Sequence, residues 1–304
     1  MNVIIKRKII LLSLIFIFAL TFVIQSISAG KSSVKNISFS EEADYIAIVS
    51  KQETIKITKE ESAYFISEKK YPAAENSAAK LFDSIKNIKV LGKATSTTSD
   101  AQKYGLDEEN RICVSAKNKD KLLQQIYIGK DTATGGQSYI QFAGKDVIYI
   151  AAGSLHSDYS ASTESLRNKS VYSLSSANIK AVSLTSAQGT FSLQKKEAKD
   201  AGESEWELLQ NEAGVKGSLD QSKVNAWISQ VARLSAQKWA DDNKDTQEAV
   251  LASLTITSTE KTVTVKLFKE NDEYLCKSSE SPYYFYLADY NAEKINKDLS
   301  DLME

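Results

Sequence analysis

The chain has 304 residues, enough to build two domains of ordinary size around separate hydrophobic cores. Its 38 lysine and arginine residues nearly cancel its 39 aspartate and glutamate residues, so the whole chain projects no strong electrostatic field. This balance argues against a polyanionic partner, and no nucleic-acid partner is expected.

The N-terminal segment combines a basic cluster with a long apolar run, the pattern of an export signal. The basic residues at 6–8 precede an apolar run over 9–24. Because about 20 apolar residues span a bilayer, residues 1–30 are expected to be a retained anchor in the cytoplasmic membrane. The alternative is a signal peptide cleaved after Ala29, although Ile27 suits such a site poorly. In both cases the rest of the chain is expected outside the cytoplasm.

The first half of the chain predicts one module of strands and a helix over 38–155. Short alternating runs from Tyr45 predict strands in "YIAIVS", "ETIKIT" and "AYFIS". After Pro72, apolar residues at helical spacing predict an amphipathic helix. Four further strands are expected in "RICVSA", "LLQQIYIG", "SYIQFA" and "DVIYIA", and the last two resemble a hairpin.

The second half repeats this order and predicts a second module over 179–304. Strands, a helical stripe from Val224 to Leu234, more strands and a closing helix from Asn291 to Leu302 follow one another. Aligning "KLFDSIKNIKVLGKA" with "NAWISQVARLSAQKW" superposes the two helical stripes, which favours an internal duplication. The Ser-rich and Asn-rich residues 156–178 are expected to form a linker. The expected fold is α+β, with two related modules that each pack an amphipathic helix on a mainly antiparallel sheet.

The two cysteines, Cys113 and Cys276, lie in apolar alternations that predict strands. Outside the cytoplasm they could pair. A small thiol is equally suited to a buried strand position, and the two lie in non-equivalent strands, so we expect free thiols.

The sequence "YGLD" is expected to be a folding element. A short helical turn from Asp100 to Tyr104 would end at Gly105 with a positive φ, since glycine lacks the Cβ that disfavours this conformation. Leu106 would then turn toward the core, and Asp107 would lead out of the turn.

Several of these segments carry a resemblance to a known family. The stretches "QKYGLDEENRICVSAK", "IYIGK", "YIQFAGKDVIYIAAGSL" and "SLRNKSVYSL" resemble the bacterial domain of unknown function numbered 4340. Its most specific parts here are Tyr104 to Asp107 and the segment around Arg167. The resemblance implies an exported or membrane-anchored protein, of a kind often encoded beside gliding-type ABC transporter components. In the second module, "NKDTQEAV" stands where a repeated "YGLD" would be expected.

No group of residues predicts a reaction. Asp107, Glu108 and Glu109 are consecutive, so their side chains diverge, and a solvated turn is expected. His156 is the single histidine, and its neighbours Ser157 and Asp158 do not make a triad, because a triad is defined by geometry. We therefore expect no enzymatic activity, cofactor or metal.

The aromatic run "SPYYFYLADY" is the remaining candidate for recognition. Alternation in a strand would direct either Tyr284 and Tyr286, or else Tyr283 and Phe285, outward while the other pair packs in the core. Packing within the sheet is the main expectation, and the outward pair, Tyr284 and Tyr286, is the possible partner surface. The expected role is that of an accessory or scaffold component in an ABC-transport or surface-machinery complex. The alternative is an extracytoplasmic binding module for a glycan, lipid or peptide.

Overall fold

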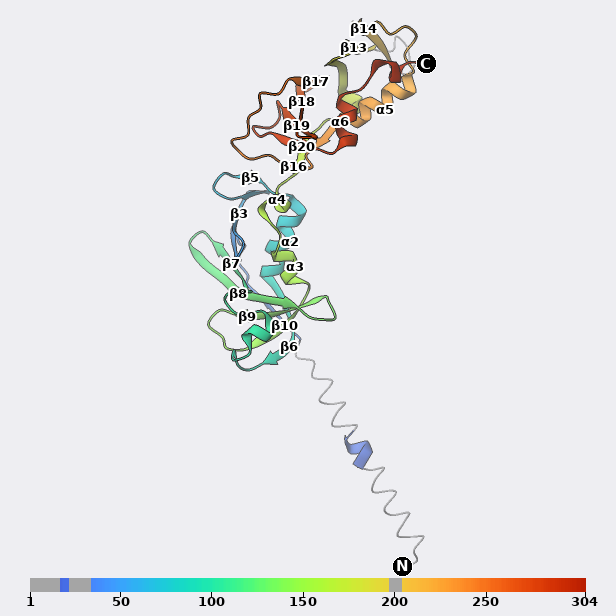
Figure 1. Cartoon of the computed structure of the whole chain (residues 1–304). Helices are drawn as coiled ribbons and strands as arrows, with labels where there is room; N and C mark the ends of the chain where they lie inside the picture. The colour runs from blue at the N-terminus through green and yellow to red at the C-terminus, as the bar shows by residue number, and fades with distance from the viewer. Residues whose placement is uncertain (1–16, 22–33, 197–203) are drawn as a thin grey trace, which may run out of the picture. The chain divides into compact units, whose positions relative to one another are not determined.

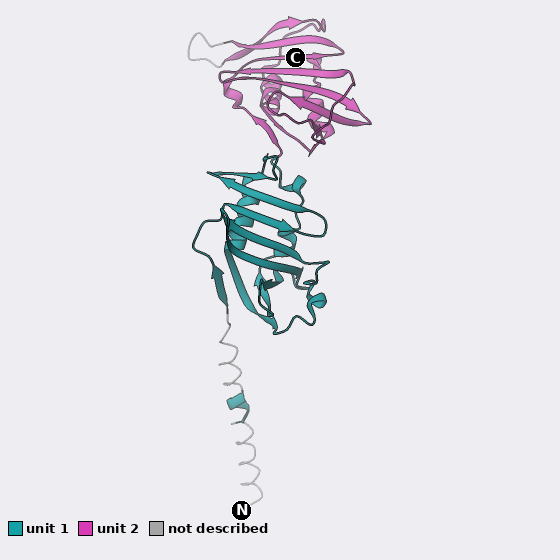
Figure 2. Cartoon of the chain, turned by 90° about the vertical axis from the view of Figure 1, so that its left-hand side faces the viewer, with its two compact units in different colours: residues 1–168 teal, residues 169–304 magenta. Residues whose placement is uncertain are grey.

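The structure is a computed structural model that describes residues 17–21, 34–196 and 204–304. The chain divides into two compact units, the first ending at Asn168 and the second beginning at Lys169 (Figure 2). Each unit contains one large antiparallel sheet with helices, which confirms the mixed α+β class. Most of the predicted N-terminal anchor, residues 1–30, lies outside the described residues. The described part of the anchor, residues 17–21, is helical.

Over residues 34–168, unit 1 contains a ten-stranded sheet, three helices and one 3-10 turn (Figure 1). Its strands are β1 (Lys35–Ser38), β2 (Tyr45–Val49), β3 (Thr54–Glu60), β4 (Ala63–Ile66), β5 (Tyr71–Pro72), β6 (Asn87–Thr95), β7 (Ile112–Asn118), β8 (Lys121–Asp131), β9 (Gln137–Phe142) and β10 (Ile148–Ala152). Its helices are α2 (Glu75–Lys86), α3 (Leu155–Tyr159) and α4 (Thr163–Leu166), and the 3-10 turn is η1 (Ala101–Tyr104).

Helix α2 packs on the sheet through the apolar stripe that the sequence predicts. The stripe is buried and consists of Ala78, Leu81, Phe82 and Ile85. Tyr159 of α3 is 1% exposed, and its hydroxyl donates to the Leu81 carbonyl at 2.6 Å. This hydrogen bond joins α3 to α2 above the sheet.

In its described residues, 169–196 and 204–304, unit 2 contains an eight-stranded sheet, a separate two-stranded ribbon and two helices (Figure 1). The sheet contains β12 (Ile179–Ser186), β13 (Gly189–Lys196), β14 (Glu205–Asn211), β16 (Lys238–Trp239), β17 (Val250–Ser258), β18 (Thr262–Glu270), β19 (Glu273–Ser278) and β20 (Phe285–Leu287). The ribbon pairs β11 (Ser170–Ser173) with β15 (Arg233–Ser235). The helices are α5 (Gln221–Val231) and α6 (Asp289–Ile295), with 3-10 turns η2 (Ser176–Asn178) and η3 (Leu299–Leu302).

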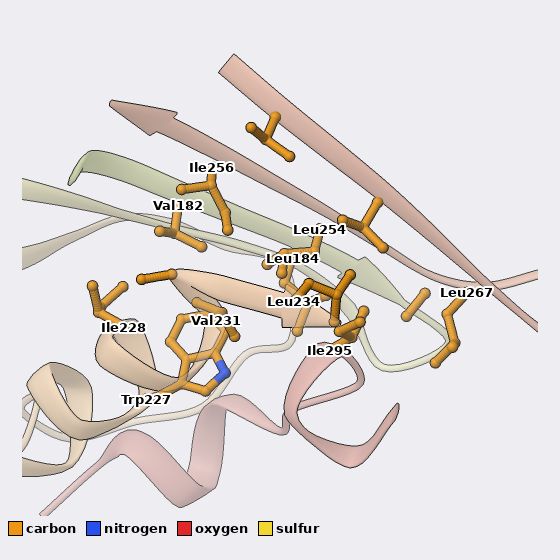
Figure 3. Close-up of a cluster of buried hydrophobic side chains, with 14 of the residues drawn as sticks. Val182, Leu184, Trp227, Ile228, Val231, Leu234, Leu254, Ile256, Leu267 and Ile295 are labelled. Carbon is orange, nitrogen blue, oxygen red and sulfur yellow. The ribbon is translucent and has the colours of Figure 1, made fainter. Parts of the chain in front are cut away.

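The core of unit 2 lies between its sheet and its helices. Trp227, Ile228 and Val231 of α5 face Val182, Leu184, Leu254 and Ile256 of the central strands (Figure 3). The side chain of Asp220 caps α5 by accepting hydrogen bonds from the Ser222 and Lys223 amides. The closing helix is shorter than predicted, because α6 ends at Ile295 and Asp298 caps the separate turn η3.

Both sheets follow the same strand order. In unit 1 the order is β5-β4-β3-β2-β7-β8-β9-β10-β6-β1, in which the run β4-β3-β2 from before α2 is followed by the meander β7-β8-β9-β10 from after it. In unit 2 the order β14-β13-β12-β17-β18-β19-β20 repeats this succession around α5. Strand β11 pairs with β15 after α5, as β1 pairs with β6 after α2.

Residues 156–178 differ from the expected linker, because they are largely folded. They contain most of α3, all of α4, β11 and η2. Tyr159 and Leu166 are buried within unit 1, whereas Tyr172 and Leu174 are buried within unit 2. The four buried side chains hold residues 156–178 against the two units, although the Ser-rich composition of this segment is typical of a linker.

Candidate functional site

The "YGLD" turn lies in the connection that carries the chain from β6 to β7. Its 3-10 turn η1 ends at Gly105, which has φ 69°. The Leu106 amide donates to the Ala101 carbonyl at 2.9 Å, and the Leu106 side chain is 2% exposed. The turn therefore reverses the chain and inserts one leucine into the core.

Gly129 of β8 accommodates this turn. A Cβ at Gly129 would lie 2.2 Å from the Tyr104 carbonyl oxygen and 2.9 Å from Cγ of Leu106. A Cβ at Gly105 would lie 2.9 Å from the Lys130 amide nitrogen. The ring of Tyr104 also packs edge-on against Tyr139 of β9, with centroids 4.8 Å apart. The segments "YGLD" and "IYIGK" are separate in sequence, and their backbones thus contact each other in the fold. Glycine at 105 and 129 permits this contact, because a Cβ at either position would collide with the other segment.

The acidic run after the turn does not converge on one point. Asp107 Oδ1 accepts from Asn110 Nδ2 at 2.7 Å. Glu108 pairs with Arg111 at 3.5 Å, and Glu109 pairs with Lys51 at 3.8 Å. The Asp107 backbone carbonyl accepts from the Asn110 and Arg111 amides, which closes a second turn. Asp107 Oδ2 is buried without a hydrogen-bond partner.

Beside this second turn lies a groove of about 480 Å³. Its walls are the β2–β3 turn at 50–52, the segment 109–112 that leads into β7, Lys130 at the end of β8, and His156 and Ser160 of the α3 region. The volume lies within the usual range of small-molecule sites.

The charged side chains that line the groove are Lys51, Arg111, Lys130 and Glu109, so cations predominate. Arg111 stacks on the Tyr127 ring at 4.4 Å, which holds its guanidinium in place. Its ion pair with Glu108 is long, and both side chains of the Lys51–Glu109 pair are largely exposed, so both ion pairs are weak. Among the described residues, Lys130 has no acidic partner.

Ser157 and Asp158 bind to different residues, and neither of them binds to His156. Ser157 Oγ donates to Asp131 Oδ2 at 2.7 Å, and Asp158 pairs with Lys80 at 2.6 Å. His156 Nδ1 is buried without a partner. The three residues that are adjacent in sequence therefore do not assemble into a triad.

Asp131 and Ser138 organise the start of α3. Ser138 is fully buried, donates to Asp131 Oδ1 at 2.5 Å and accepts from the Leu155 amide at 2.7 Å. Burial disfavours the charged carboxylate, but hydrogen bonds from Ser138 and Ser157 outweigh it and lower the pKa of Asp131. This network fixes the position of His156 at the rim of the groove.

Arg167 lies away from the groove and has a structural position. It is 8% exposed, and its guanidinium stacks on the Tyr71 ring at 3.9 Å. Its backbone forms a bridge with Ala73, and the Asn168 amide donates to the Pro72 carbonyl at 2.8 Å. The "LRN" segment thus adds a short extended stretch beside residues 72–74.

Tyr284 and Tyr286 share the sheet face opposite the main core of unit 2, since Phe285 between them is fully buried in that core. Both pack against a smaller cluster of Ala240, Phe268 and Leu275. Lys277 lies over the Tyr284 ring at 4.8 Å, and Lys238 lies over the Tyr286 ring at 4.4 Å. Burial and the nearby Asp245 raise the pKa of Tyr284. Both tyrosines are half-buried and already have contacts within the unit.

Cys113 and Cys276 are free thiols, the first half-buried and the second buried. Burial raises the pKa of Cys276. Within the described ranges, no three His, Cys, Asp or Glu side chains are grouped as a metal site would require. In the same part of the chain, no helix combines the length and apolar character that crossing a bilayer requires.

Sequence reasoning missed the groove and the glycine that faces the turn. Lys51, Arg111 and Lys130 come from three separate segments, and no spacing rule relates them. Gly129 carried a usable signal, since a glycine inside a strand pattern often marks the close approach of another backbone.

One comparison with known proteins gives a match. A family model described as Domain of unknown function (DUF4340) matches residues 64–253. No curated protein and no solved structure matches the chain.

Proposed function

The chain belongs to the family Domain of unknown function (DUF4340), and we propose that it is a non-enzymatic protein of the cell envelope. In this proposal it serves as an accessory or scaffold component of an ABC-transport or surface-machinery complex. The basic and apolar N-terminal residues support an extracytoplasmic position anchored to the cytoplasmic membrane.

The observation that carries the proposal is the tandem of two units with the same strand order. The matched region begins in unit 1 and ends in unit 2, so the family includes parts of both. The shared strand order supports an internal duplication. A duplication gives two units with similar backbones, and the surface residues of each unit can differ. Ser157 donates a hydrogen bond to Asp131, and Asp158 forms an ion pair with Lys80. These interactions support a non-catalytic role for Ser157 and Asp158.

Mild crosslinking in intact cells, followed by purification from membranes, tests this role. We expect covalent adducts with membrane components of an ABC transporter. A matched control carries a cleavable signal in place of residues 1–30, and we expect it to lose both membrane retention and adducts. A mature soluble chain that begins at Gly30, or the absence of adducts with transporter components, would contradict the proposal.

A second candidate function is a binding module for a small ligand, and the groove of unit 1 favours it. The groove has the size of a ligand site and a predominantly cationic lining. This function is compatible with a scaffold role, because the groove involves only one end of one unit.

A further inference from the structure

The groove of unit 1 offers cationic groups that a ligand can engage with little competition. Lys130 has no acidic partner among the described residues, and the Lys51–Glu109 pair is long and exposed on both sides. Arg111 is oriented by Tyr127 and only weakly held by Glu108. An incoming anion can therefore form charge-assisted hydrogen bonds without first breaking a strong ion pair.

Polar neutral groups surround these cations. Gln52, Gln102, Asn110 and His156 line the same groove. Amide and imidazole groups can donate to or accept from hydroxyl groups of a ligand. The lining thus suits a small hydrophilic molecule that carries one negative group.

Unit 2 carries different side chains at the matching strand. Strand β18 has the place of β8 in the strand order, and its residue Phe268 is buried in a cluster with Ala240 and Leu275. Its end residue Glu270 pairs at 2.6 Å with Lys244, which belongs to the connection between β16 and β17. Both side chains of this pair are part-buried, so a carboxylate that is already paired lies at this end of β18.

We propose that the groove of unit 1 is a binding site for a carboxylate or phosphate group carried on a small polar ligand such as a sugar. Lys130 and Lys51 contact the anion, and Arg111 orients it. This inference rests on the second candidate function and assigns its ligand class.

Isothermal titration of the full chain in a neutral detergent tests the site with three probes, D-glucuronate, D-glucose 6-phosphate and D-glucose. We expect saturable binding of at least one anionic sugar, with a Kd of about 1 mM or tighter, and no binding of glucose. Binding of glucuronate alone identifies a carboxylate site, and binding of glucose 6-phosphate alone identifies a phosphate site. Added salt should weaken the binding.

Lys130→Gln is expected to weaken binding by about tenfold or more, since a hydrogen bond to a charged group is lost. Lys51→Gln is the second variant. Lys121→Gln is the matched control, because Lys121 lies at the opposite end of the same strand and pairs with Glu41. Unfolding midpoints of all variants check that the fold is retained.

Three results would overturn the site: no binding of either anionic sugar, equal binding of glucose, or unchanged affinity in both Lys130→Gln and Lys51→Gln. The crosslinking result is separate. Missing transporter adducts in the wild-type chain would contradict the scaffold role and leave the titration unaffected.

Discussion

Gly129 lies directly under the carbonyl of Tyr104, so close that a Cβ on Gly129 would be 2.2 Å from that oxygen. The contact joins the middle of the sheet in unit 1 to the turn that crosses it. It places "YGLD" against "IYIGK" and supports the prediction that the turn is a folding element.

Gly129→Ala is expected to destabilise unit 1 by about 3 kcal/mol or more, because backbone rather than a flexible side chain must move. Gly92→Ala is the matched control, since Gly92 also lies in a strand but a Cβ there meets nothing within 4 Å. We expect this control to change stability by less than about 0.5 kcal/mol. Similar losses in both variants would contradict the proposed contact.

Urea unfolding can assign such a loss to one unit. The three tryptophans, Trp206, Trp227 and Trp239, all lie in unit 2. Tryptophan fluorescence therefore follows unit 2, whereas far-ultraviolet circular dichroism follows both units. A variant of unit 1 should shift the transition seen by dichroism more than the one seen by fluorescence.

Gly105→Ala should cost more than Gly144→Ala, although both glycines have a similar positive φ, 69° and 72°. Each alanine is strained by about 1–2 kcal/mol in the left-handed region. At Gly105 the new Cβ also lies 2.9 Å from the Lys130 amide, while at Gly144 it meets open space. We expect a difference of at least about 1 kcal/mol in urea unfolding. Equal costs would show that the close approach to β8 is unimportant.

Leu106→Ala is expected to cost about 2–5 kcal/mol, because its side chain is 2% exposed. Leu122→Ala serves as the control, since Leu122 of β8 is 50% exposed, and it should cost much less. Asp107→Ala is expected to cost about 1 kcal/mol through loss of the hydrogen bond from Asn110. A stable Leu106→Ala variant that lost anion binding would make the turn a site rather than a folding element.

Asp131→Asn is expected to make stability less dependent on pH. The lowered pKa of Asp131 means that the folded state favours the carboxylate. Its contribution is present above the unfolded pKa of about 3.9, and it is lost as the pH falls through the lower folded pKa. The variant should lose about 1 kcal/mol at pH 7 and approach the wild type in acid. Unfolding curves from pH 7 to acid measure this, and a constant difference at every pH would contradict it.

Local sequence patterns were enough to predict the elements whose apolar residues repeat at a regular spacing. Ala78, Leu81, Phe82 and Ile85 repeat at helical spacing, and they form the buried stripe of α2. The expectation failed over 156–178, where Tyr159 and Leu166 are single apolar residues in a Ser-rich stretch. A single apolar residue forms no periodic pattern that sequence analysis could detect. Its burial depends on side chains from elsewhere in the chain, which only the fold brings next to it.

The mixed α+β class, the helical stripes and the glycine at 105 follow from local sequence, because propensity and periodicity act between residues close in the chain. The contact of Gly129 with Tyr104 and the groove that Lys51, Arg111 and Lys130 line follow from the fold instead. These relationships join residues from separate strands, and strand order and register, rather than local pattern, bring such residues together.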